Sequence, residues 1–403
     1  MAMLDYARAS KHRCRSVIVV LSALVCRVAW ADQDSSPRQL VTIANTERRT
    51  LKSLANGVEY EIDVALPRGY SASKKRYPVM YTLDGNVFFP LLTASYRLAA
   101  RLIPDELIIV GVGYPTNDYG FWSKDYGASR ARDYTPRPAK AVGGVSARAG
   151  GAPVFLRFLR EELIPFIDSS YRTIPGNRGL MGHSYGGLFC VYVLTHEPGL
   201  FHKYAIGSPA VQWDNEAAIR WESEYAATHR ELPARVYVYI GAFEDDNIMK
   251  APTRRFWEAL QRRHYAGLDL VDFAIVPGEI HQSVSLGGME HALRSLYSPR
   301  PVSLPIESLR RYVGEWKSGN EPTWAVRVDH DRLFIDIPGF FFDDAQRAPE
   351  SHELWAKSDT SFFTELADTV VFTLDPATKL ASEMKVTMPR VGYASILRRS
   401  TAK

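Results

Sequence analysis

The chain has 403 residues, 46% of them hydrophobic and 23% charged, a composition that excludes disordered and collagen-like proteins. This length allows a large core and a second unit. Five of the 49 cations and one of the 45 anions lie in residues 1–31 and account for the whole net charge of +4. The remaining chain is balanced, which disfavours nucleic acid as a partner.

Residues 1–31 have the pattern of a secretory signal peptide. A basic start precedes the apolar run "SVIVVLSALVC" at 16–26, and a small-x-small motif ends at Ala31. The run is shorter than the roughly 20 residues that span a bilayer. We expect cleavage near Ala31 and a periplasmic or secreted protein without membrane contact afterwards, the alternative being an uncleaved anchor. Only Cys190 would then remain, so no disulfide is expected.

Strands and helices are predicted to alternate between residues 60 and 298. The first apolar run alternates as an antiparallel edge strand does, and the later runs are nearly continuous, as strands covered on both faces are. The predicted strands are 60–67, 78–85, 107–114, 178–184, 203–210, 235–242 and 271–278. The predicted helices are 86–101, 153–169, 185–196, 252–265 and 286–297. This order predicts a mostly parallel central sheet with helices on both faces.

Two stretches depart from the alternation. Residues 115–151 are rich in aromatics, Gly and Arg without periodicity, so we expect a long functional loop. Residues 299–305 are rich in Pro and indicate a linker. From 306 to 403 the alternating runs and turns, among them "TWAVRVDHDRLFIDIP" and "TVVFTLDPATKLASEMKVTMP", predict a small β-rich C-terminal domain without a catalytic constellation.

The stretch "MGHSYGGLF" contains the motif G-x-S-x-G, with Ser184 at its centre. An apolar strand precedes it and a helical run follows, which is the context that a nucleophile elbow requires. The flanking glycines allow the strained turn to form, and the following helix directs its positive end at the reacting atoms. A glycine-rich packing turn is the alternative interpretation. We expect Ser184 to be a nucleophile.

A serine nucleophile needs a base, and the base needs an acid that orients it. In this fold class the chain order is Ser, acid, His. His281 is the histidine expected in a loop after the last core strand, in "FAIVPGEIHQSV". The acid should follow the preceding strand, where Glu244, Asp245 and Asp246 are adjacent. Glu244 is favoured because it is nearest the strand end, with Asp245 second and Asp246 also open.

The oxyanion that forms during ester hydrolysis needs two preorganised donors. The backbone N–H of Tyr185, directly after the nucleophile, is the first candidate. The turn "LDGNVFF" supplies the second, from the backbone of Asn86 with Gly85 beside it. This turn is alternatively a helix cap, and the two roles are compatible.

Together these segments resemble the putative-esterase family of α/β-hydrolases, which includes esterase D-like enzymes and trilactone siderophore esterases. The resemblance covers about residues 50–298 and rests on segments such as "YPVMYTLDGN", "RARDYTP", "LREELIPFIDSSYRT", "MGHSYGGLF" and "PGEIHQSV". It implies an α/β-hydrolase catalytic domain, here taken as 32–298, with a serine carboxylesterase mechanism and no metal or cofactor. The C-terminal segment "YVGEWK" resembles, more weakly, the small β domains appended to some serine hydrolases.

The segment "RARDYTP" suggests substrate contacts. Arg130 and Arg132 are candidates to present guanidinium groups to an acidic or catecholate substrate, and a structural turn with Asp133 is the alternative. Aromatic residues are candidate walls of the pocket or, equally, parts of the core. Among them are Trp122, Trp213, Tyr114, Phe121 and Tyr126.

The function expected from the sequence is a secreted or periplasmic serine esterase that acts on a small-molecule ester through an acyl-enzyme. A siderophore-type ester is one substrate class, and a feruloyl or acetyl ester on a polysaccharide is another. An acyltransferase with the same triad is a third reading. A binding protein that keeps the fold without catalysis is the alternative of a different class. The sequence does not predict the oligomeric state.

Overall fold

The computed structural model describes residues 40–100, 103, 106–116, 123–138, 149–338, 349–389 and 391–400. Three predictions fall outside these residues: the signal peptide at 1–31, the pocket wall at Phe121 and the substrate contact at Trp122. Within the described chain, no helix has the length and apolar character needed to cross a membrane.

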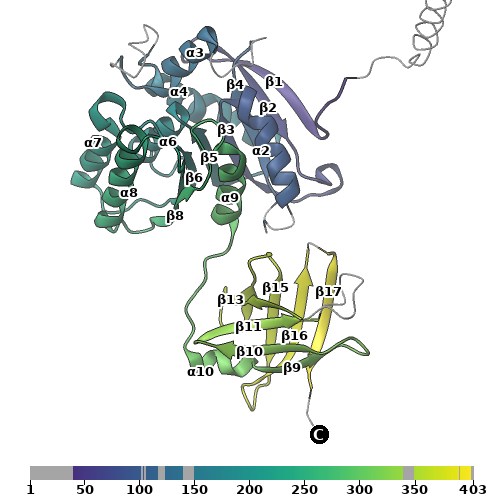
Figure 1. Cartoon of the computed structure of the whole chain (residues 1–403). Helices are drawn as coiled ribbons and strands as arrows, with labels where there is room; N and C mark the ends of the chain where they lie inside the picture. Colours follow the sequence, from purple (N-terminus) through teal and green to yellow (C-terminus); the bar gives the residue numbers. More distant parts are fainter. Residues whose placement is uncertain are drawn as a thin grey trace, which may run out of the picture. The chain divides into compact units, whose positions relative to one another are not determined.

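The first sheet has eight strands in the order β1-β2-β4-β3-β5-β6-β7-β8 (Figure 1). β2 pairs antiparallel with β1 and with β4, and the pairs from β4 through β8 are parallel. Both faces of the central strands are buried, which explains their continuous apolar runs. The strands are β1 (Thr46–Lys52), β2 (Glu59–Ala65), β3 (Tyr77–Leu83), β4 (Ile108–Gly113), β5 (Thr173–His183), β6 (Lys203–Gly207), β7 (Arg235–Gly241) and β8 (Asp269–Val276).

Helices cover both faces of this sheet and enclose two separate cores (Figure 1). On β3, Val79 and Tyr81 belong to one core and Met80 to the other, as the alternation of side chains along a strand requires. One face is covered by α3 (Lys124–Tyr134), α4 (Ala152–Phe158), α5 (Ile164–Ser170), α6 (Tyr185–His196), α7 (Trp213–Thr228) and α8 (Ala251–Arg263). The other is covered by α2 (Gly85–Ala99) and α9 (Ser285–Tyr297). The α/β-hydrolase architecture predicted from the sequence is confirmed.

Three elements of this region differ from the prediction. The strand β1 and the helix α7 were not predicted, and α3 lies within residues 115–151, which were expected to be a loop. α3 is mostly polar, so it carries little helical periodicity, but the Ser123 side chain caps it by accepting the Tyr126 N–H. The expected helix 153–169 is a continuous run of α4, the π-helical turn η2 (Leu159–Leu163) and α5. Short 3-10 and π turns, η1 (Tyr70–Ala72) and η3 (Asp246–Lys250), complete the region.

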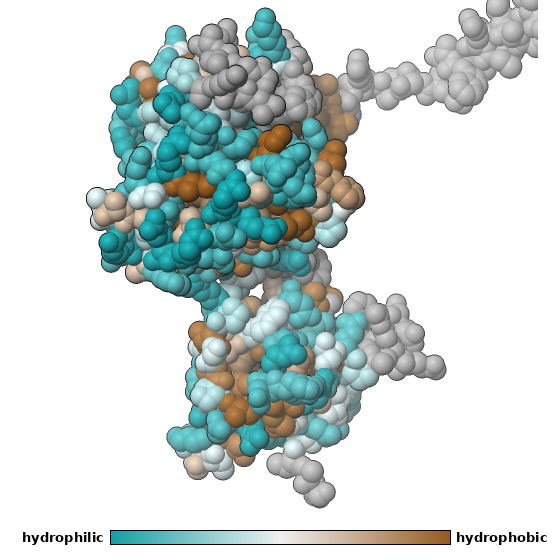
Figure 2. Space-filling model, turned by 60° about the vertical axis from the view of Figure 1, so that its left-hand side comes forward, coloured by the Kyte–Doolittle hydropathy of each residue, from teal (hydrophilic) through white to brown (hydrophobic). Residues whose placement is uncertain are grey.

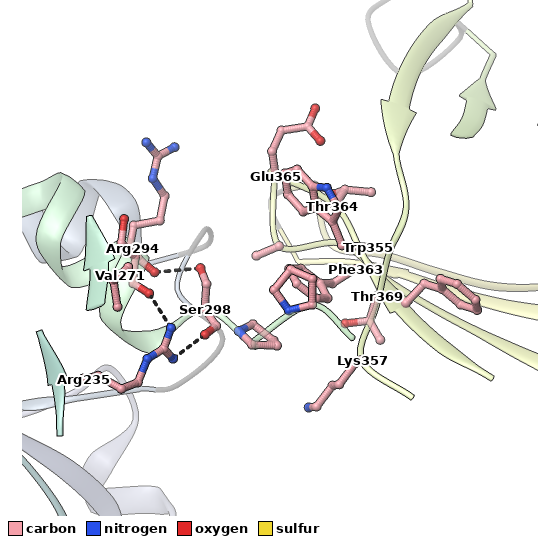
Figure 3. Close-up of a pocket in the computed structure, with 15 residues that line it drawn as sticks. Arg235, Val271, Arg294, Ser298, Trp355, Lys357, Phe363, Thr364, Glu365 and Thr369 are labelled. Carbon is pink, nitrogen blue, oxygen red and sulfur yellow. Dashed lines mark hydrogen bonds between the residues drawn. The ribbon is translucent and has the colours of Figure 1, made fainter. Parts of the chain in front are cut away.

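The surface of this region carries mainly hydrophilic residues on the face drawn in Figure 2, broken by small hydrophobic patches. At the end of α9, Arg235 of β7 donates hydrogen bonds to the carbonyls of Ser298 (2.8 Å) and Ser295 (3.2 Å), as Figure 3 shows for Ser298. A strand residue thereby satisfies carbonyls that the last helical turn leaves without partners.

The C-terminal region is a second, wholly antiparallel sheet in which strands that follow one another in the chain are neighbours, except β12 and β13, and in which the first strand, β9, also pairs with the last, β17. A short helix, α10 (Ile306–Leu309), and the turn η4 (Arg310–Tyr312) precede it. The strands are β9 (Gly314–Lys317), β10 (Trp324–Asp329), β11 (Arg332–Ile337), β12 (Glu350–Glu353), β13 (Trp355–Ala356), β14 (Ser361–Phe363), β15 (Thr369–Leu374), β16 (Ala381–Met388) and β17 (Tyr393–Arg399). The β-rich domain predicted from the sequence is therefore present.

This second sheet closes into a barrel. Its two ends in the strand order are β12 and β13, which only Leu354 separates in the chain. The Leu354 N–H donates to Leu333 O of β11 (2.8 Å), so one bent segment pairs with β11 by its first half and with β14 by its second. A closed barrel has no free edge strand. The hairpin between β10 and β11 turns through His330 and Asp331, both with positive φ, as a two-residue turn requires.

The barrel interior is packed with large side chains. Trp316, Trp324, Phe362, Phe372 and Met384 are almost fully buried in one cluster. At one end, Arg399 lies over the Trp316 ring, with the guanidinium carbon 5.1 Å from the ring centroid. Its guanidinium also donates to three backbone carbonyls, those of Ala381 (2.6 Å), Val313 (2.8 Å) and Arg311 (2.6 Å). The last strand is thereby joined to the turn that precedes the first.

Candidate active site

Ser184 lies between the end of β5 and the start of α6, with φ 59° and ψ −116°, a conformation that is strained for a residue with a Cβ. Hydrogen bonds on both sides hold it there: its N–H donates to Gly207 O (3.0 Å), and its carbonyl accepts from Leu188 N (2.9 Å). The tight turn needs glycine at position 182, because a Cβ there would lie 2.3 Å from Gly186 O. This is the backbone shape of a nucleophile elbow.

His281 follows β8, and its ring is oriented by a carboxylate. Its Nδ1 lies 2.7 Å from Glu244 Oε2, and Glu244 follows β7, the neighbouring parallel strand. The carboxyl ends of β5, β7 and β8 therefore bring together the predicted nucleophile, acid and base. Within the described part of the chain, the Ser184 hydroxyl has no hydrogen-bond partner. Contacts between a nucleophile and its base are often long in a structure without substrate.

The three adjacent carboxylates at the end of β7 do different things. Glu244 faces His281. Asp245 caps the turn η3, accepting from Asn247 N (2.8 Å) and Ile248 N (2.7 Å). Asp246 is exposed and forms an ion pair with Lys250 (2.8 Å). The geometry favours Glu244, the first choice from the sequence, as the acid partner of His281.

Glu244 is only 6% exposed, yet its carboxylate oxygens have hydrogen-bond partners. Burial raises its pKa, but hydrogen bonds from His281, Ser208 and the Gly241 N–H outweigh burial, so the pKa of Glu244 is below its usual value. Ser208 Oγ donates to Oε1 at 2.5 Å and Gly241 N at 2.8 Å. Oε2 is left for the imidazole, and the carboxylate stays charged at neutral pH.

Ser208 is a site residue that the sequence reasoning missed. It follows β6, is fully buried and has φ 36°. Its N–H donates to Tyr239 O (2.7 Å) while its hydroxyl supports Glu244. The available signal was its position in "GSPAVQW", directly after a buried strand that precedes the acid.

A second histidine, His183, contacts the first. Its ring lies 4.6 Å from the His281 ring, between centroids, and Ser285 Oγ lies 3.2 Å from its Nδ1. Burial, with the nearby charges of His281 and Arg130, holds the pKa of His183 well below its usual value. A neutral ring therefore packs against the ring of the candidate base.

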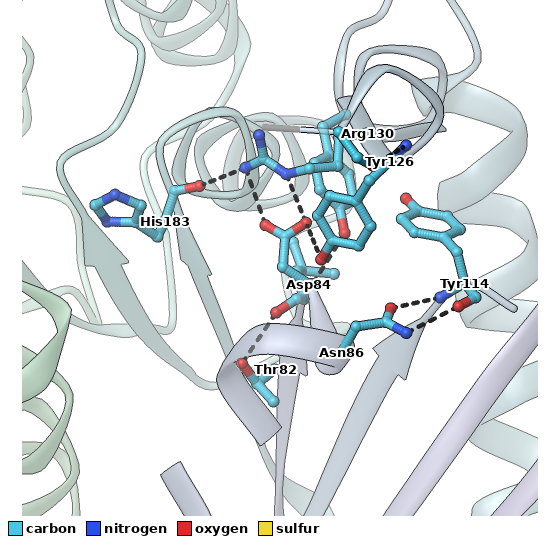
Figure 4. A network of polar contacts seen from close by, with 10 residues as sticks. Thr82, Asp84, Asn86, Tyr114, Tyr126, Arg130 and His183 are labelled. Atoms are coloured by element: carbon cyan, nitrogen blue, oxygen red, sulfur yellow. Dashed lines mark hydrogen bonds and ion pairs between the residues drawn. The ribbon is translucent and has the colours of Figure 1, made fainter. Parts of the chain in front are cut away.

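The predicted oxyanion donors lie at two helix N-termini. Tyr185 begins α6, and Gly85 and Asn86 begin α2 after Asp84. The first N–H groups of a helix have no acceptor within it, so they can receive a negative oxygen. Asn86 is clamped by its side chain, which donates to Tyr114 O (2.8 Å) and accepts from Tyr114 N (2.7 Å) (Figure 4).

The predicted substrate contacts have other partners in the structure. Arg132 pairs with Asp133 through two hydrogen bonds of 2.7 Å, the alternative that the sequence left open. Trp213 is 4% exposed and packs in the larger core. Arg130 is buried against Asp84 rather than Asp133. The substrate roles of Arg132, Trp213 and Trp122 stay predictions. No cluster with metal-ligand composition occurs among the described residues.

The eight-stranded sheet, its helices and the turn at Ser184 place the chain in the class of α/β-hydrolases. A model of the family described as putative esterase matches residues 53–284, more than half of the chain, so the chain belongs to that family. It is therefore an esterase of the α/β-hydrolase fold.

The chain is similar to a named siderophore esterase and to solved structures that include a serine hydrolase. The ferri-bacillibactin esterase BesA of Bacillus subtilis is 29% identical over 274 residues, which are 64% of this chain and 91% of that protein. The BES protein of Bacillus cereus has a TM-score of 0.57 at 29% identity, covering 65% of this chain and 100% of that one. An IroE-like serine hydrolase from Shewanella oneidensis has a TM-score of 0.54 at 27% identity, covering 65% of this chain and 82% of that one.

Proposed function

We propose that the chain is a serine esterase in which Ser184 is the nucleophile, His281 the general base and Glu244 the orienting acid. The observation that carries this proposal is the 2.7 Å contact between Glu244 and His281 at the sheet edge where the strained Ser184 turn also lies. A carboxylate held by Ser208 and Gly241 fixes the imidazole so that its Nε2 is left for the serine.

In the proposed reaction, Ser184 Oγ attacks the ester carbonyl carbon while its proton passes to His281 Nε2. The N–H groups of Tyr185 and Asn86 stabilise the oxyanion. The bond to the leaving alkoxide breaks, and His281 returns the proton to it. Water then attacks the acyl-enzyme with His281 again as base, which releases the acid and restores Ser184. Ester and water become acid and alcohol, and no residue changes its net state.

The substrate class that we propose is a siderophore-type ester. Support comes from the names of the similar proteins, which include the ferri-bacillibactin esterase and a siderophore enterobactin esterase of Emericella nidulans that is 33% identical over 170 residues, 40% of this chain and 56% of that protein. We further propose that residues 1–31 direct export and are removed. N-terminal sequencing of the mature protein should begin near Asp32.

The nucleophile is tested with Ser184→Ala. We expect kcat for p-nitrophenyl butyrate to fall about 10⁵–10⁶-fold, because the residual rate rests on binding and the oxyanion donors alone. A fluorophosphonate probe should label the wild-type protein at Ser184, by peptide mass spectrometry, and should not label the variant. Ser169→Ala, a change at an exposed serine, is the control. A wild-type protein that the probe leaves unlabelled would contradict the serine mechanism and favour a binding protein.

The substrate class is tested by comparing kcat/KM for a catechol trilactone with kcat/KM for a feruloyl sugar. We expect the trilactone to be preferred by at least about 100-fold, the scale that a few well-placed polar contacts provide. Preference for the feruloyl sugar would move the proposal to polysaccharide esters. Transfer of the acyl group to an added alcohol in preference to water would identify an acyltransferase.

A further inference from the structure

The structure contains a buried ionic network at the candidate oxyanion hole, formed by Asp84, Arg130 and Tyr126 (Figure 4), with Tyr134 beside them. Arg130 donates to Asp84 Oδ1 through Nε (2.6 Å) and to Oδ2 through Nη2 (3.0 Å). Tyr126 OH donates to Oδ1 (3.2 Å), and the Asp84 N–H donates to Tyr134 OH (3.1 Å). This Asp84–Arg130 network is not part of the Ser, His and Glu constellation.

The network joins three elements that are distant in the chain. Arg130 and Tyr126 come from α3, Asp84 precedes α2, and Arg130 Nη2 also donates to the carbonyl of His183 at the end of β5 (3.2 Å). One guanidinium therefore contacts both the turn before α2 and the strand end before α6, as Figure 4 shows.

Each of these two contact points lies two residues before a candidate oxyanion donor. Asp84 is followed by Gly85 and Asn86, and His183 is followed by Ser184 and Tyr185. The two segments also approach each other closely, since a Cβ built on Gly186 would lie 3.3 Å from Asp84 Oδ2. Arg130 connects Asp84 to the His183 carbonyl, so the distance between the two N–H donors depends on how Arg130 holds these two groups.

The charge states within the Asp84–Arg130 network are determined by burial and by the neighbouring charges. Arg130 is 5% exposed and Asp84 fully buried. Burial lowers the pKa of Arg130, but the adjacent Asp84 raises it more, so the guanidinium remains charged. Burial also raises the pKa of Tyr126, which keeps its hydroxyl protonated as a donor. The two charged groups of a buried ion pair must stay in close contact, because either charge left alone in the interior is strongly unfavourable.

We infer that Arg130 is a positioning residue that sets the spacing of the two oxyanion donors, Tyr185 N–H and Asn86 N–H, without touching the substrate. This inference rests on the proposed serine mechanism. It differs from the substrate contact that the sequence suggested for Arg130, because the Nε and Nη2 donors are already engaged inside the protein. The planar guanidinium suits the role, since it reaches a carboxylate and a carbonyl in fixed directions at once.

The test uses Arg130→Lys in the full chain, since lysine keeps the positive charge and loses the planar fork. We expect kcat for p-nitrophenyl butyrate to fall about 100-fold, the scale of one misplaced oxyanion donor, with KM within about threefold of wild type. A reversible trifluoromethyl ketone inhibitor, whose adduct carries an oxyanion, should lose affinity by the same factor. A role confined to folding would not produce this parallel loss in the folded protein.

A matched control comes from a similar arrangement away from the site. Arg263 of α8 donates to the buried Glu222 (3.0 Å), which Tyr265 OH also contacts (2.7 Å). Arg263→Lys should leave kcat and inhibitor affinity within about twofold of wild type. If Arg130→Lys does not fold, Tyr126→Phe replaces it. That variant removes one donor to Asp84 and should lower kcat and inhibitor affinity in parallel by about threefold to tenfold.

Unchanged kcat and inhibitor affinity in folded Arg130→Lys, or in Tyr126→Phe if that variant replaces it, would overturn the inference. A rise in KM at constant kcat would overturn it too, because it would indicate a substrate contact. Failure of the serine mechanism itself gives a different result, namely no fluorophosphonate labelling of the wild-type protein.

Discussion

The two sheets of this protein use their buried residues in opposite ways. At the carboxyl edge of the eight-stranded sheet, charged and polar groups such as Asp84, Arg130 and Glu244 are buried, and Ser184 and Ser208 hold positive φ angles. The barrel interior is a cluster of apolar and aromatic side chains around Trp316 and Trp324, with alternation along each strand.

This difference predicts how each region responds to substitution. Buried charges and strained φ angles persist only when the surrounding structure determines them, and they concentrate at functional sites. An apolar barrel needs only to exclude water and is tolerant of exchange among residues of similar size. We therefore expect substitutions at the carboxyl ends of the parallel strands to lower catalytic activity more than stability. Substitutions in the barrel should lower stability more than catalytic activity.

Among changes to the buried residues of the two regions, Glu244→Gln should have the largest effect. The amide cannot stabilise the imidazolium and favours the wrong ring tautomer, so kcat should fall about 10³–10⁴-fold, as measured with p-nitrophenyl butyrate. Asp245→Asn is the matched change one residue on. It should keep kcat within about threefold of wild type and lower stability by at most about 1 kcal/mol, because Asn also caps helical turns. Equal losses in both variants would contradict the assignment of the acid.

The opposite behaviour is expected for Arg399→Met in the barrel. The change removes three hydrogen bonds to carbonyls and the contact with Trp316. We expect about 2–4 kcal/mol of lost stability, measured by urea unfolding followed through Trp fluorescence, with kcat on p-nitrophenyl butyrate within twofold of wild type. A large fall in kcat with intact folding would mean that the barrel takes part in catalysis.

The smallest effect concerns acid stability. The pKa of Glu244 is lower in the folded protein than its usual value of 4.5, so its charged form stabilises the fold above that value. This contribution is lost as pH falls through the folded pKa. The unfolding free energy of the wild type should therefore fall more steeply between pH 5 and pH 3 than that of Glu244→Gln. Parallel curves would show that the carboxylate is not stabilised by its partners.

Much of the fold was predictable from local patterns. Buried parallel strands such as β3 and β7 are apolar runs, and G-x-S-x-G between a strand and a helix located Ser184. β1 was missed because its sequence, "TERRTLK", is polar on both faces of an edge strand. The helix α7 was missed because its sequence, "WDNEAAIRWESEYAAT", distributes charged residues among the apolar ones and shows little amphipathic periodicity.

Only those residues of the site that a short stretch of sequence marks were predictable. Three carboxylates follow β7, and the choice of Glu244 rested on nearness to the strand end, whereas the structure separates them by the direction in which the turn presents each side chain. The contact of Arg130 with Asp84 joins residues 46 positions apart, and no local pattern marks it. Such pairs depend on how helices pack on the sheet, which periodicity does not encode.

Closure of the barrel has a consequence for self-association. Unpaired strand edges invite another chain to add a strand, and a closed barrel offers none. The eight-stranded sheet, by contrast, ends in β1 and β8, and β1 carries Glu47, Arg48 and Arg49 in succession. The nine strands of the barrel are thereby added to this chain without the two open ends of a flat sheet, and β8, with the sequence "DLVDFAIV", is the less charged of the two end strands of the first sheet.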